Sequence, residues 1–248
     1  MFQDRLLYFP EKTTVADVAS ESLRVWPTSD EFRGFVAVPT GAVRGTAIVF
    51  HGNAGHAGHR AYYAAVLTTL GFRVILAEYP GYGPRGGQLG EQRLVDDAEQ
   101  TVNRAYGMYH SPLLLIGESL GAAVAAAATS RLPDKISGLI LLTPWDRLAT
   151  IAAYHFPWLP VRWFLRDHYD SVANLAACDR PVLVAVAEKD SVVPARFGTA
   201  LYESLSARKR LKTVSGSDHN DWQGRVDLTW WREAVQFLLE SPAGLDAG

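Results

Sequence analysis

Short aliphatic runs alternate with longer segments of helical periodicity along most of this chain. Most of the runs are apolar at nearly every position, which is typical of strands buried on both faces of a sheet. They cover residues 45–50, 72–77, 113–116, 136–142, 181–187 and 211–214. The segments of helical character cover residues 60–70, 91–109, 195–207 and 222–239. Strands that alternate with helices predict an α/β fold with a mostly parallel central sheet and helices on both faces.

The N-terminal part of the chain has a different texture. Residues 5–9, 22–26 and 33–38 are short segments rich in aromatic and β-branched side chains, and the last two are followed by Pro27 and Pro39. Proline at strand ends is compatible with edge strands. We therefore expect an antiparallel hairpin region ahead of the parallel strands.

Residues 145–178 interrupt the alternation of strands and helices with an aromatic segment that contains Trp158 and Trp163. Pro157 and Pro160 break the helical periodicity there, so a core helix and a small lid that lines an acyl pocket are both compatible with it. The chain shows no linker composition and no internal repeat. We expect a single domain, residues 1–248, with a lid-like insert at about 145–178.

Composition and charge exclude several classes of function. The formal net charge of −2 over 248 residues predicts no nucleic-acid partner. No run reaches the ~20 apolar residues that span a bilayer, so no integral membrane segment is expected. The single cysteine, Cys178, excludes an internal disulfide and is typical of a reducing compartment, so we expect a cytoplasmic location. No cluster of Cys and His has metal-ligand spacing, so no metal site is expected.

One strand-to-helix junction carries the strongest chemical signal. The buried strand 113–116 runs into G-E-S-L-G at residues 117–121, and an alanine-rich helical segment follows. This context predicts a nucleophile elbow, in which a serine occupies a strained backbone conformation at a tight turn. Glycine is needed two residues before and two residues after Ser119, because side chains there would collide. We predict that Ser119 is a nucleophile.

A serine nucleophile needs a base, and the base needs a carboxylate that orients it. The polar residues of interest should follow the strands, because sites in open α/β sheets lie at the carboxyl ends of the strands. Asp190 follows the strand 181–187, and His219 is the only histidine after it. We predict Asp190 as the acid and His219 as the base. Asp146, which follows the preceding strand, is the alternative acid.

The remaining requirement is a pair of donors for an oxyanion. The turn H-G-N-A-G at residues 51–55 follows a buried strand, and Leu120 begins the helix after Ser119. We predict that the backbone N–H groups of Asn53 and Leu120 are the donors. Phosphate binding is the competing interpretation of a glycine-rich turn, but this turn lacks the Lys and Ser/Thr of a P-loop. His51 is expected to turn back beneath the loop, and Asp218 and Asp221 to cap the loop around His219.

Taken together, the motifs resemble the α/β-hydrolase superfamily. Those that carry the resemblance are H-G-N-A-G at 51–55, Y-P-G-Y-G at 79–83, G-E-S-L-G at 117–121, E-K-D-S-V-V-P at 188–194 and D-H-N-D at 218–221. The chain order Ser119, Asp190, His219 is also that of this superfamily. Within it, the chain is similar to the small serine hydrolases marked by H-G-N-A-G, which include esterases, lysophospholipase-like enzymes and protein depalmitoylases. Pro80 stands where such proteins often carry Arg.

The resemblance implies an α/β-hydrolase fold and hydrolysis of a small-molecule ester or thioester through an acyl-enzyme intermediate, with no cofactor. The leading hypothesis is a carboxylic-ester hydrolase for small to medium lipophilic acyl groups, with Tyr82, Trp158 and Trp163 in contact with the substrate. A thioesterase or depalmitoylase would use the same mechanism. A peptidase is less favoured, since no acidic cluster for a substrate amine is visible. A non-catalytic binding protein on the same scaffold is the hypothesis from another class.

Overall fold

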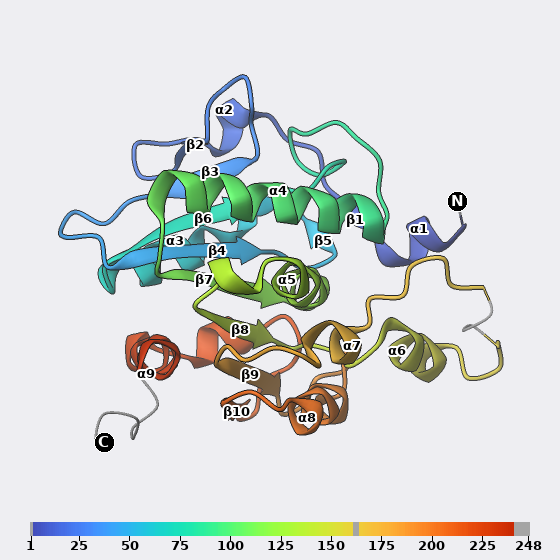
Figure 1. Ribbon diagram of the computed structural model, residues 1–248. Coiled ribbons are helices and arrows are strands. Elements are labelled where there is room, and N and C mark those ends of the chain that lie inside the picture. Colours follow the sequence, from blue (N-terminus) through green and yellow to red (C-terminus); the bar gives the residue numbers. More distant parts are fainter. Residues whose placement is uncertain (1, 161–163, 241–248) are drawn as a thin grey trace, which may run out of the picture.

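The computed structural model describes residues 2–160 and 164–240, and these residues build an eight-stranded sheet of order β10-β9-β8-β7-β4-β6-β3-β2 (Figure 1). The strands are β2 (Arg24–Trp26), β3 (Gly34–Ala37), β4 (Gly45–Phe50), β6 (Phe72–Ala77), β7 (Leu113–Glu118), β8 (Gly138–Leu142), β9 (Val182–Ala187) and β10 (Lys209–Val214). Strands β10 to β6 pair in parallel, whereas β3 is antiparallel to β6 and β2 is antiparallel to β3. The mostly parallel sheet and the early hairpin are confirmed.

Helices cover both faces of this sheet. One apolar cluster joins Ile48 and Phe50 to helices α4 (Glu91–Tyr109), α5 (Leu120–Arg131), α7 (Ser171–Leu175) and α8 (Ala195–Ser204). The other joins Ala47 and Val49 to α3 (Ala61–Thr69) and α9 (Leu228–Leu239). Since neighbouring residues of a strand point to opposite faces, β4 contributes to both clusters, which explains why it is apolar throughout.

Short elements complete the described part of the chain. They are α2 (Val15–Val18), α6 (Leu148–His155) and the 3₁₀ turns η1 (Ala57–Arg60), η2 (Pro133–Lys135) and η4 (Trp222–Arg225). Within the described ranges, no helix combines the length and the apolar character needed to cross a membrane.

The N-terminal segment differs from its prediction. Residues 5–9, expected as a strand, lie mostly in helix α1 (Phe2–Leu7), and only the two-residue strand β1 (Phe9–Pro10) follows. Strand β1 pairs in parallel with β5 (Ala54–Gly55), which belongs to the turn after β4. Periodicity alone does not separate helix from strand in so short an apolar run. The pairing brings the start of the chain to the carboxyl end of β4.

Helix α5 is buried on nearly every side, and all its residues from Leu120 to Thr129 are buried. It packs against β7, α4 and α7. Alanine dominates because its small side chain allows close approach from all directions while keeping the highest helix propensity. This burial holds the residue that precedes the helix, Ser119, in a defined place.

The insert between β8 and β9 contains α6 and α7. Helix α6 buries Leu148 and Ile151, so a core role holds for this part of the insert. Trp158 is 73% exposed and Phe164 is 77% exposed, so the core interpretation is wrong for Trp158. Trp163 lies outside the described residues. Because β4 and β8 are parallel, α6 follows β8 at the same end of the sheet as β5 and α1 (Figure 1).

Candidate active site

Ser119 lies on the turn between β7 and α5. Its φ of 53° and ψ of −114° fall in a region that residues other than glycine rarely adopt. A Cβ atom on Gly117 would lie 2.4 Å from the Gly121 carbonyl oxygen, and one on Gly121 would lie 2.0 Å from the Phe50 carbonyl oxygen. A side chain at position 117 would collide with the turn itself, as predicted, whereas one at position 121 would collide with the backbone at the end of β4. The requirement for glycine at both positions is confirmed, and the structure adds the reason for Gly121.

A row of hydrogen bonds leads from Ser119 into the protein. The Nε2 atom of His219 lies 3.1 Å from Ser119 Oγ, and its Nδ1 atom lies 2.8 Å from Asp190 Oδ2. The other carboxylate oxygen, Asp190 Oδ1, accepts the N–H groups of Val192 and Val193 at 3.0 and 2.6 Å. A carboxylate accepts, so Nδ1 carries the proton and Nε2 is free to accept the Ser119 hydroxyl proton. The three predicted residues come together in the geometry that proton transfer from a serine requires.

Asp146, the alternative acid, has another position and other partners. Its Oδ1 atom accepts the N–H of Arg147 at 2.7 Å and the hydroxyl of Thr150, which places the carboxylate at the start of α6. These bonds satisfy donors at the helix N-terminus, where an acidic side chain is stabilising. The structure therefore pairs His219 with Asp190 and assigns Asp146 to the helix end.

Asp218 connects the loops that hold the acid and the base. Its Oδ1 atom accepts the N–H groups of Ser191 and His219, both at 2.7 Å, and its two oxygens lie 2.9 Å from the Ser191 hydroxyl. Hydrogen bonds from Ser191 and then His219 lower the pKa of Asp218, so it stays a carboxylate. Asp221 Oδ1 accepts the N–H of Asp218 at 2.6 Å. Both aspartates cap the loop, as expected.

The predicted oxyanion donors lie at two turns. Leu120 is the first residue of α5, so its N–H has no carbonyl four residues earlier in the helix. Asn53 lies in the turn after β4, and its side-chain amide donates to the Leu7 carbonyl at 3.0 Å. Its carbonyl oxygen accepts the N–H of Phe9 at 2.8 Å. Leu7 and Phe9 of the N-terminal segment thus hold the turn 51–55 through hydrogen bonds to Asn53.

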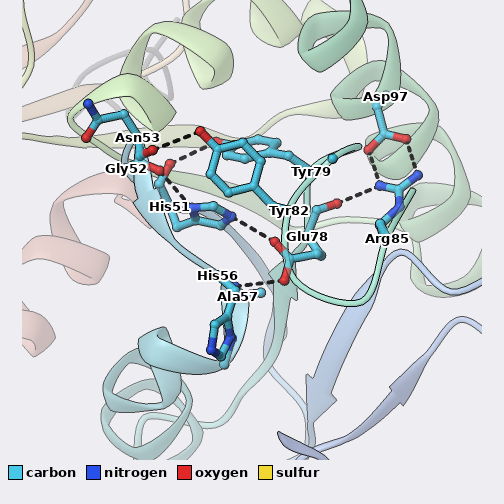
Figure 2. A network of polar contacts seen from close by, with 12 residues as sticks. His51, Gly52, Asn53, His56, Ala57, Glu78, Tyr79, Tyr82, Arg85 and Asp97 are labelled. Atoms are coloured by element: carbon cyan, nitrogen blue, oxygen red, sulfur yellow. Dashed lines mark hydrogen bonds and ion pairs between the residues drawn. The ribbon is translucent and has the colours of Figure 1, made fainter. Parts of the chain in front are cut away.

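Tyr82 was expected to contact the substrate, and the structure contradicts this. Its side chain is fully buried, because the loop 79–83 folds back beneath the turn 51–55 (Figure 2). Its hydroxyl donates to the Asn53 carbonyl oxygen at 2.8 Å. Burial raises the pKa of Tyr82 well above its usual value, so the hydroxyl remains a donor. Tyr82 supports the turn and does not line a substrate surface.

Glu78 is a residue of this site that the sequence analysis missed. It follows β6 directly, it is fully buried, and its carboxylate contacts the His51 ring beneath the turn, where His51 was expected (Figure 2). A charged residue at the end of a buried strand, at the edge where the site lies, is a signal that could have identified it. Buried carboxylates are uncommon unless they are paired.

One group of side chains has some of the features of a metal site. Glu11, His56 and His59 bring three possible ligand atoms within 4.8 Å of one another. However, His56 Nδ1 already accepts the N–H of Gly58 at 3.1 Å. Burial and the neighbouring His59 lower the pKa of His56, so its ring is neutral and the other nitrogen carries the proton. In this arrangement His56 has no lone pair to offer an ion.

The sequence of this chain matches a known protein family and several known proteins. The family described as serine aminopeptidase, S33, matches residues 41–168. An uncharacterized protein of Mycobacterium tuberculosis is 37% identical over 96% of this chain and 88% of its own length. The lysophosphatidylserine lipase ABHD12 of Danio rerio is 32% identical over 66% of this chain and 48% of its own length.

A solved structure agrees at the level of the fold. The monoacylglycerol lipase of Paleococcus ferrophilus superposes with a TM-score of 0.63 at 19% identity, over 84% of this chain and 98% of that one. At that identity the likeness concerns the fold alone. The family match covers more than half of the chain, and it agrees with the sheet order, the turn at Ser119 and the full-length relative. The chain therefore belongs to the α/β-hydrolase superfamily and is a hydrolase of the family described as serine aminopeptidase, S33.

Proposed function

We propose that this protein is a serine hydrolase that cleaves carboxylic esters of small to medium lipophilic acyl groups. The observation that carries the proposal is the unbroken hydrogen-bonded row from Ser119 through His219 to Asp190. Together with the strained turn at Ser119, it supplies a nucleophile, a base and an orienting carboxylate in the arrangement that acyl transfer needs.

In the first half-reaction, Ser119 Oγ attacks the ester carbonyl carbon while His219 Nε2 takes the hydroxyl proton. Asp190 keeps the proton of His219 on Nδ1 and stabilises the imidazolium that forms. The N–H groups of Asn53 and Leu120 stabilise the oxyanion, a contribution of several kcal/mol when such donors are preorganised. The carbon–oxygen bond to the alcohol then breaks, and His219 returns the proton to the leaving alkoxide.

In the second half-reaction, water replaces the alcohol. His219 Nε2 removes a proton from the water as it attacks the acyl carbon, and the same two donors stabilise the second oxyanion. Collapse of this intermediate breaks the bond to Ser119 Oγ, which takes the proton back from His219. The acid product leaves, and the serine is regenerated without any cofactor.

The preference for lipophilic acyl groups rests on the insert. Trp158 and Leu159 are exposed apolar residues that follow α6, and α6 follows β8, whose carboxyl end lies beside that of β7, the strand that leads into Ser119. We propose that Trp158 and Trp163 contact the acyl chain. The Danio rerio relative is named a lysophosphatidylserine lipase, which supports an acyl ester with a lipophilic chain as the substrate class.

Active-site labelling and a graded set of substrates test the proposal. A fluorophosphonate probe should label the wild-type protein once and leave Ser119→Ala unlabelled. The wild type should hydrolyse p-nitrophenyl esters, and Ser119→Ala should not. Equal labelling of both proteins would refute the serine mechanism. A wild type that neither reacts nor turns over would indicate a binding protein on this scaffold. Faster turnover of acyl-thioesters than of matched esters would favour the thioesterase alternative.

A further inference from the structure

The turn after β4 has an unusual pattern of hydrogen bonds. Three consecutive carbonyl oxygens, those of residues 51, 52 and 53, each accept a hydrogen bond from a side chain of one buried network (Figure 2). Tyr79 donates to the His51 carbonyl at 2.9 Å, and Tyr82 donates to that of Asn53 at 2.8 Å. The middle carbonyl, that of Gly52, lies 2.7 Å from His51 Nδ1.

The contact between His51 Nδ1 and the Gly52 carbonyl bears directly on the Asn53 N–H, one of the two proposed oxyanion donors. The Gly52 carbonyl and the Asn53 N–H belong to the same peptide unit, which is trans. In a planar trans peptide the C=O and N–H bonds point in opposite directions. A hydrogen bond that holds the Gly52 carbonyl toward His51 therefore directs the Asn53 N–H to the opposite side, away from the network.

The position of the proton on His51 follows from its partners. A carbonyl oxygen only accepts, so His51 Nδ1 must carry a proton for the 2.7 Å contact with Gly52 to be a hydrogen bond. The other ring nitrogen, Nε2, lies 3.0 Å from Glu78 Oε1. Whether the shared proton of this contact resides on Nε2 or on Glu78, Nδ1 remains a donor. The contact with Glu78 is therefore compatible with the hydrogen bond from Nδ1 to the Gly52 carbonyl.

Glu78 is itself held in place. It is fully buried, and its second oxygen accepts the N–H of Ala57 at 3.0 Å. Its backbone carbonyl accepts a hydrogen bond from Arg85 at 2.6 Å, and Arg85 pairs with Asp97 through two contacts of 2.7 Å. A Cβ atom on Gly83 would lie 2.2 Å from Glu78 Oε2, so the chain also encloses the carboxylate sterically.

We propose that His51 is a positioning residue that orients the Asn53 N–H toward the oxyanion, and that Glu78 holds the His51 ring in the required orientation. The inference rests on the proposed function and adds to it the residues that act through Asn53. Neither His51 nor Glu78 touches the substrate. The predicted consequence is a loss of transition-state stabilisation, with little change in substrate binding, when the contact with Gly52 is removed.

Two substitutions of His51 separate its two contacts. The amide of glutamine reaches the position of Nε2, so His51→Gln keeps a partner for Glu78 and loses the donor to Gly52. The shorter amide of asparagine occupies the position of Nδ1, so His51→Asn keeps that donor and loses the contact with Glu78. We expect His51→Gln to lower kcat by about 10- to 100-fold at unchanged KM, somewhat less than deletion of an oxyanion donor costs. Its melting temperature should stay near that of the wild type.

His51→Asn should behave in the opposite way. Its melting temperature should fall, because the buried Oε1 atom of Glu78 loses its partner, while its kcat at 25 °C should exceed that of His51→Gln. Wild-type kcat in His51→Gln would overturn the proposal. So would kcat losses in both variants that simply follow the loss in melting temperature, since a purely structural role predicts that result.

A spectroscopic measurement tests the inference without catalysis. In ¹⁵N-histidine-labelled protein, the Nδ1 resonance of His51, identified by its absence from His51→Asn, should be that of a proton-bearing nitrogen. An unprotonated Nδ1 would overturn the proposal whatever the enzyme hydrolyses. Failure of the proposed function would instead appear in the wild type, as missing turnover and missing fluorophosphonate labelling together with a protonated Nδ1.

Discussion

The Nε2 atom of His219 lies 3.1 Å from the Oγ atom of Ser119, although 100 residues separate the two along the chain. Ser119 follows β7 and His219 follows β10, with β8 and β9 between these strands in the sheet. The loop after β10 therefore reaches back across the end of β9, where it meets Asp190. Asp218 holds the two loops together through its bonds to Ser191. The contact between serine and histidine depends on loops that are fastened to one another as well as on parallel strands.

The identity of the acid can be tested by a matched pair of substitutions. Asp190→Asn should lower kcat by roughly 10⁴-fold, because an asparagine no longer holds the proton of His219 on Nδ1. Asp146→Asn changes a carboxylate of similar burial whose hydrogen bonds go to Arg147 and Thr150 at the start of α6, and it should leave kcat within about tenfold of the wild type. Steady-state kinetics with thermal melts of both variants decide the question. The reverse pattern would show that Asp190 is not the acid.

The two glycines around Ser119 should be irreplaceable for folding. In Gly121→Ala, the new Cβ would lie 2.0 Å from the Phe50 carbonyl oxygen, so we expect the free energy of unfolding to fall by roughly 3 kcal/mol or more. Gly107→Ala is the control, since a Cβ there meets nothing within 4 Å in α4. It should stabilise the protein by up to about 1 kcal/mol. Urea denaturation measures both, and similar values for the two variants would contradict the steric argument.

Trp158→Ala tests the proposed acyl contact. The side chain is 73% exposed, so its truncation should change the free energy of unfolding by less than about 0.5 kcal/mol. Contact with an acyl chain is worth up to about 0.8 kcal/mol per methylene, so kcat/KM for octanoyl esters should fall by ~10–100-fold. Acetyl esters should be hydrolysed at nearly the wild-type rate, because they do not reach the insert. Equal losses on both esters would refute the acyl contact, and Trp163→Ala should be measured alongside.

The stability of the protein in acid should depend on Asp218. Its folded-state pKa is lowered by the hydrogen bonds from Ser191 and His219, so its carboxylate stabilises the folded state above the unfolded pKa of about 3.9. This stabilisation disappears as the pH falls through the lower, folded-state pKa. Asp218→Asn removes the titrating group, so below pH ~4 the urea midpoint of the wild type should fall more steeply than that of the variant. Parallel curves for the two proteins would show that Asp218 does not contribute to the acid response.

Much of this protein could be predicted from local patterns in its sequence. Apolar runs such as 113–116 predicted buried strands because a strand with helices on both faces has no solvent-exposed side. Gly117 and Gly121 predicted the turn at Ser119 because the G-x-S-x-G pattern is local, although the clash that requires glycine at 121 is with the Phe50 carbonyl at the end of β4. The rule that polar residues of interest follow the strands then pointed to Asp190 and His219, which the structure places in one hydrogen-bonded row.

The tertiary structure alone decided the features that depend on distant partners. Residues 5–7 lie in helix α1, whereas Phe9 pairs with Ala54 of β5, a contact that no local pattern encodes. Tyr82 is buried because its loop folds beneath the turn 51–55, where its hydroxyl donates to the Asn53 carbonyl, and no local pattern encodes that contact. Glu78 could not be assigned a partner until β4 and β6 were adjacent. A strand period of two or a helix period of 3.6 specifies which face of an element is buried, whereas the partner it meets there depends on how the whole sheet is ordered.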